Sequence, residues 1–403
     1  MINVKKGKVD VQLLIVVGVL LAVGTIVLFS ASAPTAYNET KDVFSYLKKH
    51  LIFLGVGLIV MFFASIISMK IIRKYSWLIY AIGVVGLLIV FSPLGIEVNG
   101  ARRWVALGDF SFQPSEFMKI ALVFFISKKM ATLGEDLSKK MSYIFYGIVL
   151  ALPAGILVFQ HHLSAIGIIL ITAIVMLLIG EMKKRYFAAF AGVAALLATG
   201  FTLFSSFRYA RLLTFLDPLN AANMQGTGWQ IGNSLMAIGS GGLFGLGFGK
   251  SVHKFILPEP QNDFIFAILV EEMGLIGALI VLLLFGFLIY RGITAAIKAK
   301  DKFSSYVAIG ITLVILIQVI MNILVVTSLM PVTGISLPFF SYGGTSLIIL
   351  MGSMGILLNI SRKDVKMDES IEGARSKKHE SNHRRRRHSG THLPRHSSGK
   401  KTY

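Results

Sequence analysis

Long segments without a charged residue constrain this chain more than any other feature of its sequence. A helix that crosses a bilayer needs about 20 consecutive, mostly apolar residues. Several charge-free segments have this length: Val11–Asn38, Leu51–Met69, Trp77–Ile96, Met141–Gln160, Leu163–Gly180 and Tyr186–Phe207. Only 15% of the 403 residues are charged, against roughly 25% in soluble domains. The sequence therefore predicts an all-α integral membrane protein.

The last third of the chain contains further apolar sequence of the same kind. Phe264–Tyr290 is interrupted only by Glu271 and Glu272. Phe303–Ser361 carries no charge over a length that accommodates two helices. Between these two helices, residues 330–338 include two prolines and a glycine, which favour a break.

The segment Pro114–Ala131 decides the number of helices, because it contains four charged side chains. Counting it gives ten spans, and omitting it gives nine. With ten spans and a cytoplasmic N-terminus, the short inner loops collect most of the loop Lys and Arg residues, as the positive-inside rule requires. Nine spans would place residues 128–140, with four lysines, outside. We therefore expect ten transmembrane helices, with both termini in the cytoplasm.

Two segments lie outside the pattern of spans. Residues 207–263, between the seventh and eighth helices, form a large, glycine-rich extracytoplasmic loop that we expect to be structured, because long connections are usually functional. Residues 362–403 lack apolar periodicity and contain Arg384–Arg387. This tail is expected to be disordered and attracted to anionic lipids, leaving 1–361 as the membrane domain. The net charge of +20 therefore indicates membrane loops rather than nucleic-acid binding.

Asp263 is the ionisable residue that stands out, because charged groups at membrane depth are costly and often functional. It closes the glycine-rich loop and opens an apolar helix, after the sequence Leu257-Pro-Glu-Pro260. One carboxylate is thereby placed at the outer membrane boundary, at the start of a helix. Asp is also a favoured helix N-cap residue. The residues alone leave capping and catalysis open.

Three other acidic residues and one lysine lie within apolar segments. Glu116 and Lys119 are three residues apart on a helix, so we expect them to face and neutralise each other. Glu271 and Glu272 lie two turns into their helix, and at 100° per residue they point away from Asp263. For both glutamates we expect polar contacts between helices rather than a catalytic pair of carboxylates.

Several basic residues lie on the outer side, against the positive-inside trend. Anionic headgroups or a phosphorylated lipid would explain this placement, because arginine binds phosphate oxygens bidentately. Ordinary solvation of a surface side chain is the alternative for each residue. The residues are Arg102, Arg103, Arg208, Arg211, Lys250 and Lys254.

Five separated motifs resemble the signatures of the SEDS proteins (shape, elongation, division and sporulation). The motifs are Asn99-Gly-Ala-Arg-Arg-Trp104, Gln113-Pro-Ser-Glu-Phe-Met-Lys119, Gly239-Ser-Gly-Gly-Leu-Phe-Gly245, Leu257-Pro-Glu-Pro-Gln-Asn-Asp-Phe-Ile-Phe266 and Leu337-Pro-Phe-Phe-Ser-Tyr-Gly-Gly344. The resemblance extends in order from about Val11 to Arg362 and is greater to the FtsW and SpoVE branch than to the RodA branch. Where the family often has Gln-Pro-Asp, this chain has Gln160-His161-His162, so no acid occupies position 162.

The resemblance implies a peptidoglycan glycosyltransferase that polymerises lipid II, for division or sporulation. The family's essential aspartate aligns with Asp263. In this chemistry the 4-hydroxyl of one lipid II attacks and inverts the anomeric carbon of the growing strand, and lipid pyrophosphate leaves. The hydroxyl needs one general base. Because pyrophosphate is a good leaving group, a second, protonating acid of the kind used by most glycosidases is not required.

The resemblance also implies that the other charged residues act on the leaving group, where negative charge develops. Cationic side chains or a divalent cation, Mg²⁺ or Mn²⁺, stabilise such charge; Glu116 would orient Lys119 or help to hold the cation. The expected phosphate contacts are Arg102, Arg208, Arg211 and Lys119, followed by Arg103, Lys250 and Lys254. A class B penicillin-binding protein and other division proteins are the implied partners.

Two other functions remain open from the sequence. A lipid II flippase would also use charges at membrane depth, although transporters often show internal repeats and broken helices, and we identify no clear repeat. A non-catalytic scaffold for other cell-wall enzymes would tolerate the loss of Asp263. Polymerisation by an Asp263 variant distinguishes these functions from the enzyme.

Overall fold

The computed structural model describes residues 9–98, 100–108, 110–133, 140–180 and 228–362, together with positions 7, 183, 186, 188 and 192. Its helices are α1 (Val11–Thr40), α2 (Ser45–Ile66), α3 (Met69–Ile89), α4 (Pro114–Leu133), α5 (Lys140–Phe159), α6 (Leu163–Ile179), α10 (Trp229–Gly241), α11 (Ile265–Ile297), α12 (Lys302–Val326) and α13 (Gly344–Ile360). The strands are β1 (Gly95–Val98), β2 (Ala101–Leu107) and β3 (Phe110–Phe112).

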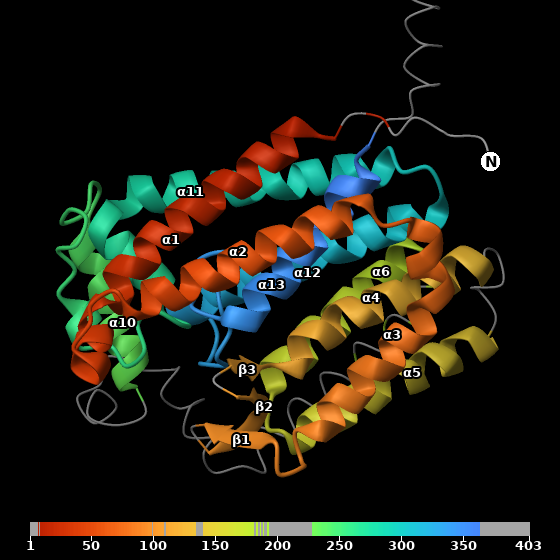
Figure 1. The fold of residues 1–403 in the computed structure, drawn as a ribbon, viewed down its shortest axis with the longest axis horizontal. Helices are drawn as coiled ribbons and strands as arrows, with labels where there is room; N and C mark the ends of the chain where they lie inside the picture. The colour runs from red at the N-terminus through yellow and green to blue at the C-terminus, as the bar shows by residue number, and fades with distance from the viewer. Residues whose placement is uncertain are drawn as a thin grey trace, which may run out of the picture. The chain divides into compact units, whose positions relative to one another are not determined.

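Within the part of the chain that the structure describes, six helices are long and apolar enough to cross a membrane: α1, α2, α3, α5, α11 and α12. The apolar helices α6 and α13 are shorter, with 17 residues each. The charged helix α4 packs among α3, α6 and α12 (Figure 1), and therefore belongs to the bundle as the charge distribution predicted. The span expected over Tyr186–Phe207 and the tail lie largely or wholly outside the described residues.

The helices alternate in direction, so the bundle of residues 10–361 has two ends. At the hairpin end, which contains β1–β3, the Thr345 hydroxyl at the start of α13 donates to the Ser111 carbonyl of β3 at 3.2 Å. At the opposite end, Arg291 of α11 forms an ion pair with Asp10 before α1. The Asp10 amide also donates to the Ser361 hydroxyl after α13, at 3.4 Å. These contacts join helices that are distant in sequence.

A small antiparallel sheet, β1-β2-β3, interrupts the otherwise helical bundle between α3 and α4 (Figure 1). Val98 pairs with Ala101 across the two residues Asn99 and Gly100. Gly100 has a φ of 74°, which glycine adopts without steric cost. The sequence analysis did not anticipate this sheet, although Asn-Gly between apolar residues is a strong hairpin signal.

Helix α11 is broken at Gly274, whose backbone has φ 69° and ψ −174°. The loop that follows α10 supplies the hydrogen bonds that the break removes. Leu246 and Gly247 donate their amides to the carbonyls of Glu271 and Glu272, at 2.9 and 3.0 Å. The helix amides beyond the break are paired in the same way, because Leu275 donates to the Gly242 carbonyl at 2.9 Å.

Glycines allow backbones to meet closely at several other points of the bundle. A Cβ atom at Gly24 of α1 would lie 2.2 Å from the carbonyl oxygen of Phe339, which precedes α13. A Cβ atom at Gly18, on the same helix, would meet no atom within 4 Å. Only Gly24 is therefore required by packing.

The two glycines give a matched test of this packing. We expect Gly24→Ala to lower the free energy of unfolding by roughly 1–3 kcal/mol, the usual cost of overpacking. Gly18→Ala should be neutral or slightly stabilising, because alanine favours the helix. Thermal unfolding of both variants in detergent measures the difference. Equal melting temperatures would show that α1 does not pack against Phe339 in this way.

Candidate active site

Asp263 lies at the hairpin end, in the turn of residues 261–264 that leads into α11. Its side chain is neither fully buried nor fully exposed. The residue at the N-cap position of α11 is Phe264. Asp263 therefore directly precedes the N-cap position rather than occupying it.

An asparagine of α12 fixes the backbone of Asp263. The Asn322 amide nitrogen donates to the carbonyl of Asp263 at 2.8 Å and to the carbonyl of Ile335 at 2.6 Å. Asn322 is buried, with 1% of its surface exposed. Because unpaired carbonyls at such depth are costly, this amide ties the turn to the segment 330–343 between α12 and α13. Sequence analysis missed Asn322, although a polar residue inside a charge-free span is a usable signal.

Ser341 and Tyr342 make two further connections between the same segments. The Ser341 hydroxyl donates to the Asn262 carbonyl and accepts from the Leu337 amide, each at 2.7 Å. The Tyr342 amide donates to the Gln261 carbonyl at 2.8 Å. Three consecutive residues before α11 are therefore fixed, which gives the carboxylate a rigid support.

The carboxylate of Asp263 faces Gly334. A Cβ atom at Gly334 would lie 3.3 Å from Asp263 Oδ2, and the φ of Gly334 is 68°. The carbonyl of this glycine accepts from the Ser164 hydroxyl of α6 at 3.4 Å. Gly334 thus leaves room beside the carboxylate and connects its surroundings to the start of α6.

A small polar hollow adjoins the segment that supports Asp263. Its walls come from the starts of α4 and α13, the middle of α12, and residues 336–341. Five of its lining residues are polar: Glu116, Gln318, Ser336, Ser341 and Ser346. Ser341 therefore contributes both to the support of Asp263 and to the wall of the hollow.

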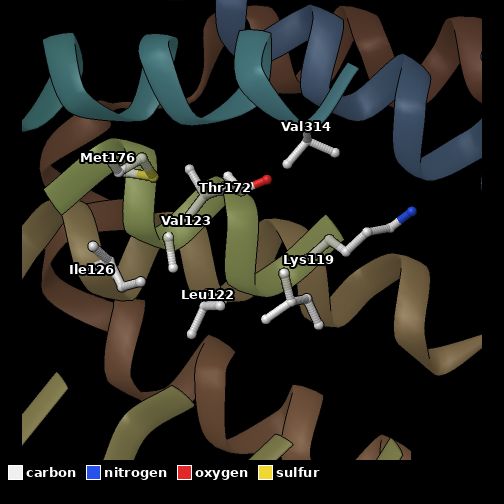
Figure 2. A pocket seen from close by; sticks show the side chains of 9 residues that line it. Lys119, Leu122, Val123, Ile126, Thr172, Met176 and Val314 are labelled. Carbon is white, nitrogen blue, oxygen red and sulfur yellow. The ribbon is translucent and has the colours of Figure 1, made fainter. Parts of the chain in front are cut away.

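Glu116 and Lys119 form the ion pair that their spacing predicted, with 2.8 Å between the carboxylate and the ammonium. The side chain of Lys119 is 3% exposed and that of Glu116 is 15% exposed. Lys119 also lines a second, mainly apolar hollow between α4, α6 and α12. Figure 2 shows its ammonium at one end of that hollow, away from Ile126 and Met176.

His162 follows α5 in the turn before α6, and its imidazole is buried. Burial, together with the charges of Arg103 and Lys119, lowers the pKa of His162 to about 3. The neutral imidazole of His162 is thus influenced by the charges of Arg103 and Lys119, two of the residues predicted to contact phosphate. Among the described residues, no group of three His, Asp or Glu side chains is arranged to hold a metal.

The predicted outer arginines have different environments. Arg102, on β2, is half-exposed and lies 3.5 Å from the Glu97 carboxylate. Arg103 donates to the carbonyl of His161 at 2.5 Å, and so fixes the turn between α5 and α6. Arg208 and Arg211 lie outside the described residues. Lys250 is exposed.

The structure places Lys254 inside the protein and not in the lining of the polar hollow. Its side chain is 6% exposed, and its ammonium lies 3.3 Å from the Glu272 carboxylate. It also donates to the Gly249 carbonyl at 2.7 Å and to the Ser30 hydroxyl of α1 at 3.2 Å. A buried ammonium with a carboxylate partner neutralises charge inside the protein.

Glu271 and Glu272 make the polar contacts between segments that their positions predicted. Glu271 accepts from the Val252 amide at 3.1 Å and pairs with His253 Nδ1 at 2.8 Å. Glu272 accepts from the Ser30 hydroxyl at 2.5 Å. Both carboxylates thereby attach residues 251–254 to the broken part of α11, and Glu272 also attaches α1.

This network predicts a large loss of stability when Lys254 is neutralised. Removing one partner of a buried ion pair costs about 3–5 kcal/mol, because the other charge remains buried. We expect Lys254→Met to lower the melting temperature in detergent sharply, whereas the exposed Lys250→Met should leave it unchanged. Restoration of stability in the double variant Lys254→Met/Glu272→Gln checks that the pair is responsible. Equal melting temperatures for the two single variants would contradict the assignment.

Comparison with known proteins agrees with this architecture. The family model FtsW/RodA/SpoVE, described as cell cycle protein, matches residues 11–366. Stage V sporulation protein E of Bacillus subtilis is 41% identical over 362 residues, which cover 89% of this chain and 98% of that protein. A probable peptidoglycan glycosyltransferase FtsW of Geobacter sp. is 36% identical over 358 residues, or 88% of this chain and 97% of that protein.

Two solved structures share the fold. One, from work on the structural coordination of polymerization and crosslinking by a peptidoglycan synthase complex, has a TM-score of 0.74 and 25% identity over 88% of this chain and 97% of the other. The second, rod shape determining protein RodA of Thermus thermophilus, has a TM-score of 0.66 and 26% identity over 88% and 96%. With its helical plan and its matched length, the chain belongs to the FtsW/RodA/SpoVE family of cell cycle proteins.

Proposed function

We propose that Asp263 is the general base with which this chain, a peptidoglycan glycosyltransferase of the FtsW/SpoVE type, polymerises lipid II. The proposal rests on the contacts that hold Asp263 in place. Its backbone is fixed by Asn322, and its carboxylate faces Gly334. A rigid, partly exposed carboxylate at a helix start meets the first requirement of a general base, which is a defined position toward its proton donor.

In the proposed reaction, the Asp263 carboxylate accepts the proton of the sugar 4-hydroxyl. The hydroxyl oxygen forms a bond to the anomeric carbon of the growing strand while the bond from that carbon to the pyrophosphate oxygen breaks. The carbon is inverted, and the electron pair leaves with the lipid pyrophosphate. One carboxylate is sufficient, because the leaving group departs as an anion.

Cationic groups at the hairpin end favour the departure of this anion. Lys119 is the first of the described candidates, because its partner Glu116, 2.8 Å away, lines the polar hollow beside the segment that supports Asp263. Arg102 is exposed and held only loosely, and is therefore free to contact a phosphate. Arg208 and Arg211 remain candidates from sequence. A divalent cation, when bound, would supply further positive charge at the pyrophosphate.

The protein is a membrane protein, and the charge distribution supports a definite orientation. Lys70, Arg73 and Lys74 lie in the first two turns of α3, at the end of the bundle opposite the hairpin. Under the positive-inside rule, that end is cytoplasmic and the hairpin end is extracytoplasmic. The site then opens where lipid-linked sugars are presented.

A class B penicillin-binding protein is the proposed partner. A structural relative belongs to a peptidoglycan synthase complex that coordinates polymerization and crosslinking, and crosslinking requires a transpeptidase. The partner would couple strand synthesis by this chain to that second step.

The break in α11 gives little support to the alternative function as a flippase. Broken helices of transporters expose backbone groups to a substrate cavity. Here the groups freed at Gly274 are paired with the loop backbone, and Glu271 and Glu272 are paired with His253 and Lys254. The polar hollow is lined by α4, α12 and α13 rather than by the break.

The assignment of the base predicts that Asp263→Asn loses glycan polymerisation. The amide has nearly the same shape but does not accept the proton, and general-base catalysis contributes typically 10²–10⁴-fold. The measurement is turnover of lipid II by purified protein, alone and with its transpeptidase partner. Wild-type strand synthesis by this variant would refute the role of Asp263 and would favour the flippase or the scaffold.

Glu259→Gln is the matched control for this experiment. Glu259 is exposed in the same loop and pairs with Asn262 at 2.8 Å, but it does not contact the supports of Asp263. It should retain polymerisation. Equal losses in both variants would indicate that any change in the loop, rather than the loss of the base, abolishes activity.

The second prediction concerns the leaving group. Lys119→Met should reduce turnover by a factor on the order of 10–100, because one charge-assisted phosphate contact contributes about 1.5–3 kcal/mol. Lys128→Met, nine residues further along α4 and outside the lining of the hollow, should leave turnover unchanged. Melting temperatures of both variants separate catalysis from folding. Unchanged turnover in Lys119→Met would restrict this lysine to pairing with Glu116.

A further inference from the structure

The segment from α10 to the start of α11 follows α11 closely, which would not be expected of a loop in water. Helix α10 packs against α11, and Gly241 at its end meets the backbone of Val270 and Glu271. The chain then turns at residues 242–249 and returns along α11 to the turn before Ile265. Figure 1 shows this return beside α10, at the same end of α11.

The depth of the turn follows from its pairing with α11. Gly242 accepts from Leu275, which is ten residues beyond the start of the helix at Ile265. At 1.5 Å per residue, Leu275 lies about 24 Å from Arg291, which pairs with Asp10 at the opposite end of the bundle, and so within the outer part of the 30 Å hydrocarbon core. On the return, His253 and Lys254 are level with Glu271 and Glu272, about 29 Å from Arg291 and so at the outer boundary of that core.

The polar groups of this segment are satisfied internally. The amides of Leu246 and Gly247 and the carbonyls of Gly242 and Leu243 bond to the broken backbone of α11. The ammonium of Lys254 is neutralised by Glu272. Non-helical backbone at membrane depth requires pairing of this kind.

The outward side chains of the segment are large and apolar. We call them the apolar ledge; they are Leu243 (59% exposed), Phe244 (79%), Phe248 (53%), Val252 (57%) and Phe255 (71%). The ledge is continuous with an exposed apolar part of α11, because Leu243 bonds through its carbonyl to Ile276, which is 43% exposed. Leu279 and Ile280 extend this surface along the helix.

We infer that the apolar ledge is immersed in the acyl chains of the extracytoplasmic leaflet, so that residues 242–256 form a re-entrant membrane anchor rather than an aqueous loop. Hydrocarbon is the occupant that fits the depth, the internal pairing of charges and the continuity with α11. Lys250, which is exposed, would extend its ammonium to the interface, as long basic side chains do. The anchor would fix the height of Asp263 relative to the lipid phosphates.

The absence of cysteine from the chain permits a direct test. Single variants Phe244→Cys and Phe255→Cys are labelled with a nitroxide, and the full chain is reconstituted alone in phospholipid vesicles. Electron paramagnetic resonance then compares the accessibility of the label to oxygen, which concentrates in hydrocarbon, and to a water-soluble nickel chelate. Leu279→Cys on α11 is the lipid-facing control, and Glu97→Cys on the exposed β1 is the aqueous control.

The expected result is an oxygen-to-chelate ratio at positions 244 and 255 that matches position 279 and exceeds position 97. A ratio like that of position 97 would overturn the inference, because the segment would be in water. Low accessibility to both reagents would also overturn it, because protein would cover the ledge. The readout does not depend on catalysis, so loss of the Asp263 assignment would leave this result intact.

Discussion

The break in α11 is the constraint on which the extracytoplasmic part of the structure depends. A helix that loses its own hydrogen bonds at membrane depth needs other partners, because lipid offers none. The loop after α10 supplies them, and Gly245 and Gly274 allow the two backbones to approach within a distance that a side chain would prevent. The loop and the helix therefore depend on each other, because backbone groups of each would lack hydrogen-bond partners without the other.

The two buried carboxylates reinforce this interdependence. Glu271 binds the backbone and imidazole of His253, while Glu272 joins Lys254 and Ser30. One cluster thus holds α1, α11 and the returning loop together. Because the loop continues directly into the turn of Asp263, the cluster contributes to the position of the proposed base without contacting substrate.

A second set of contacts acts from the other side of that turn. Asn322 and Ser341 are neutral residues from α12 and from the segment before α13, and they hold the backbone of residues 262 and 263. Ser341 also lines the hollow beside Glu116. The segment that supports Asp263 and the helix that carries the Glu116–Lys119 ion pair therefore line the same hollow. A general base and a phosphate-binding group need this proximity.

Several features of this site could be predicted from the sequence, because they are local. The spacing of Glu116 and Lys119 on one helix fixed their pairing, and the position of Asp263 at the start of an apolar segment identified it as a candidate. The fate of Lys254 could not be predicted in this way. Its partner Glu272 is 18 residues away along the chain, and only the return of the loop brings them together.

The sequence by itself determined that the chain spans a membrane, because long charge-free segments have no stable alternative in water, and it determined the family through motifs in order. Tertiary structure alone decided which polar groups meet. The pairing of the break at Gly274, the fixing of the turn around Asp263 and the burial of Lys254 all involve segments distant in sequence, which only the fold brings together.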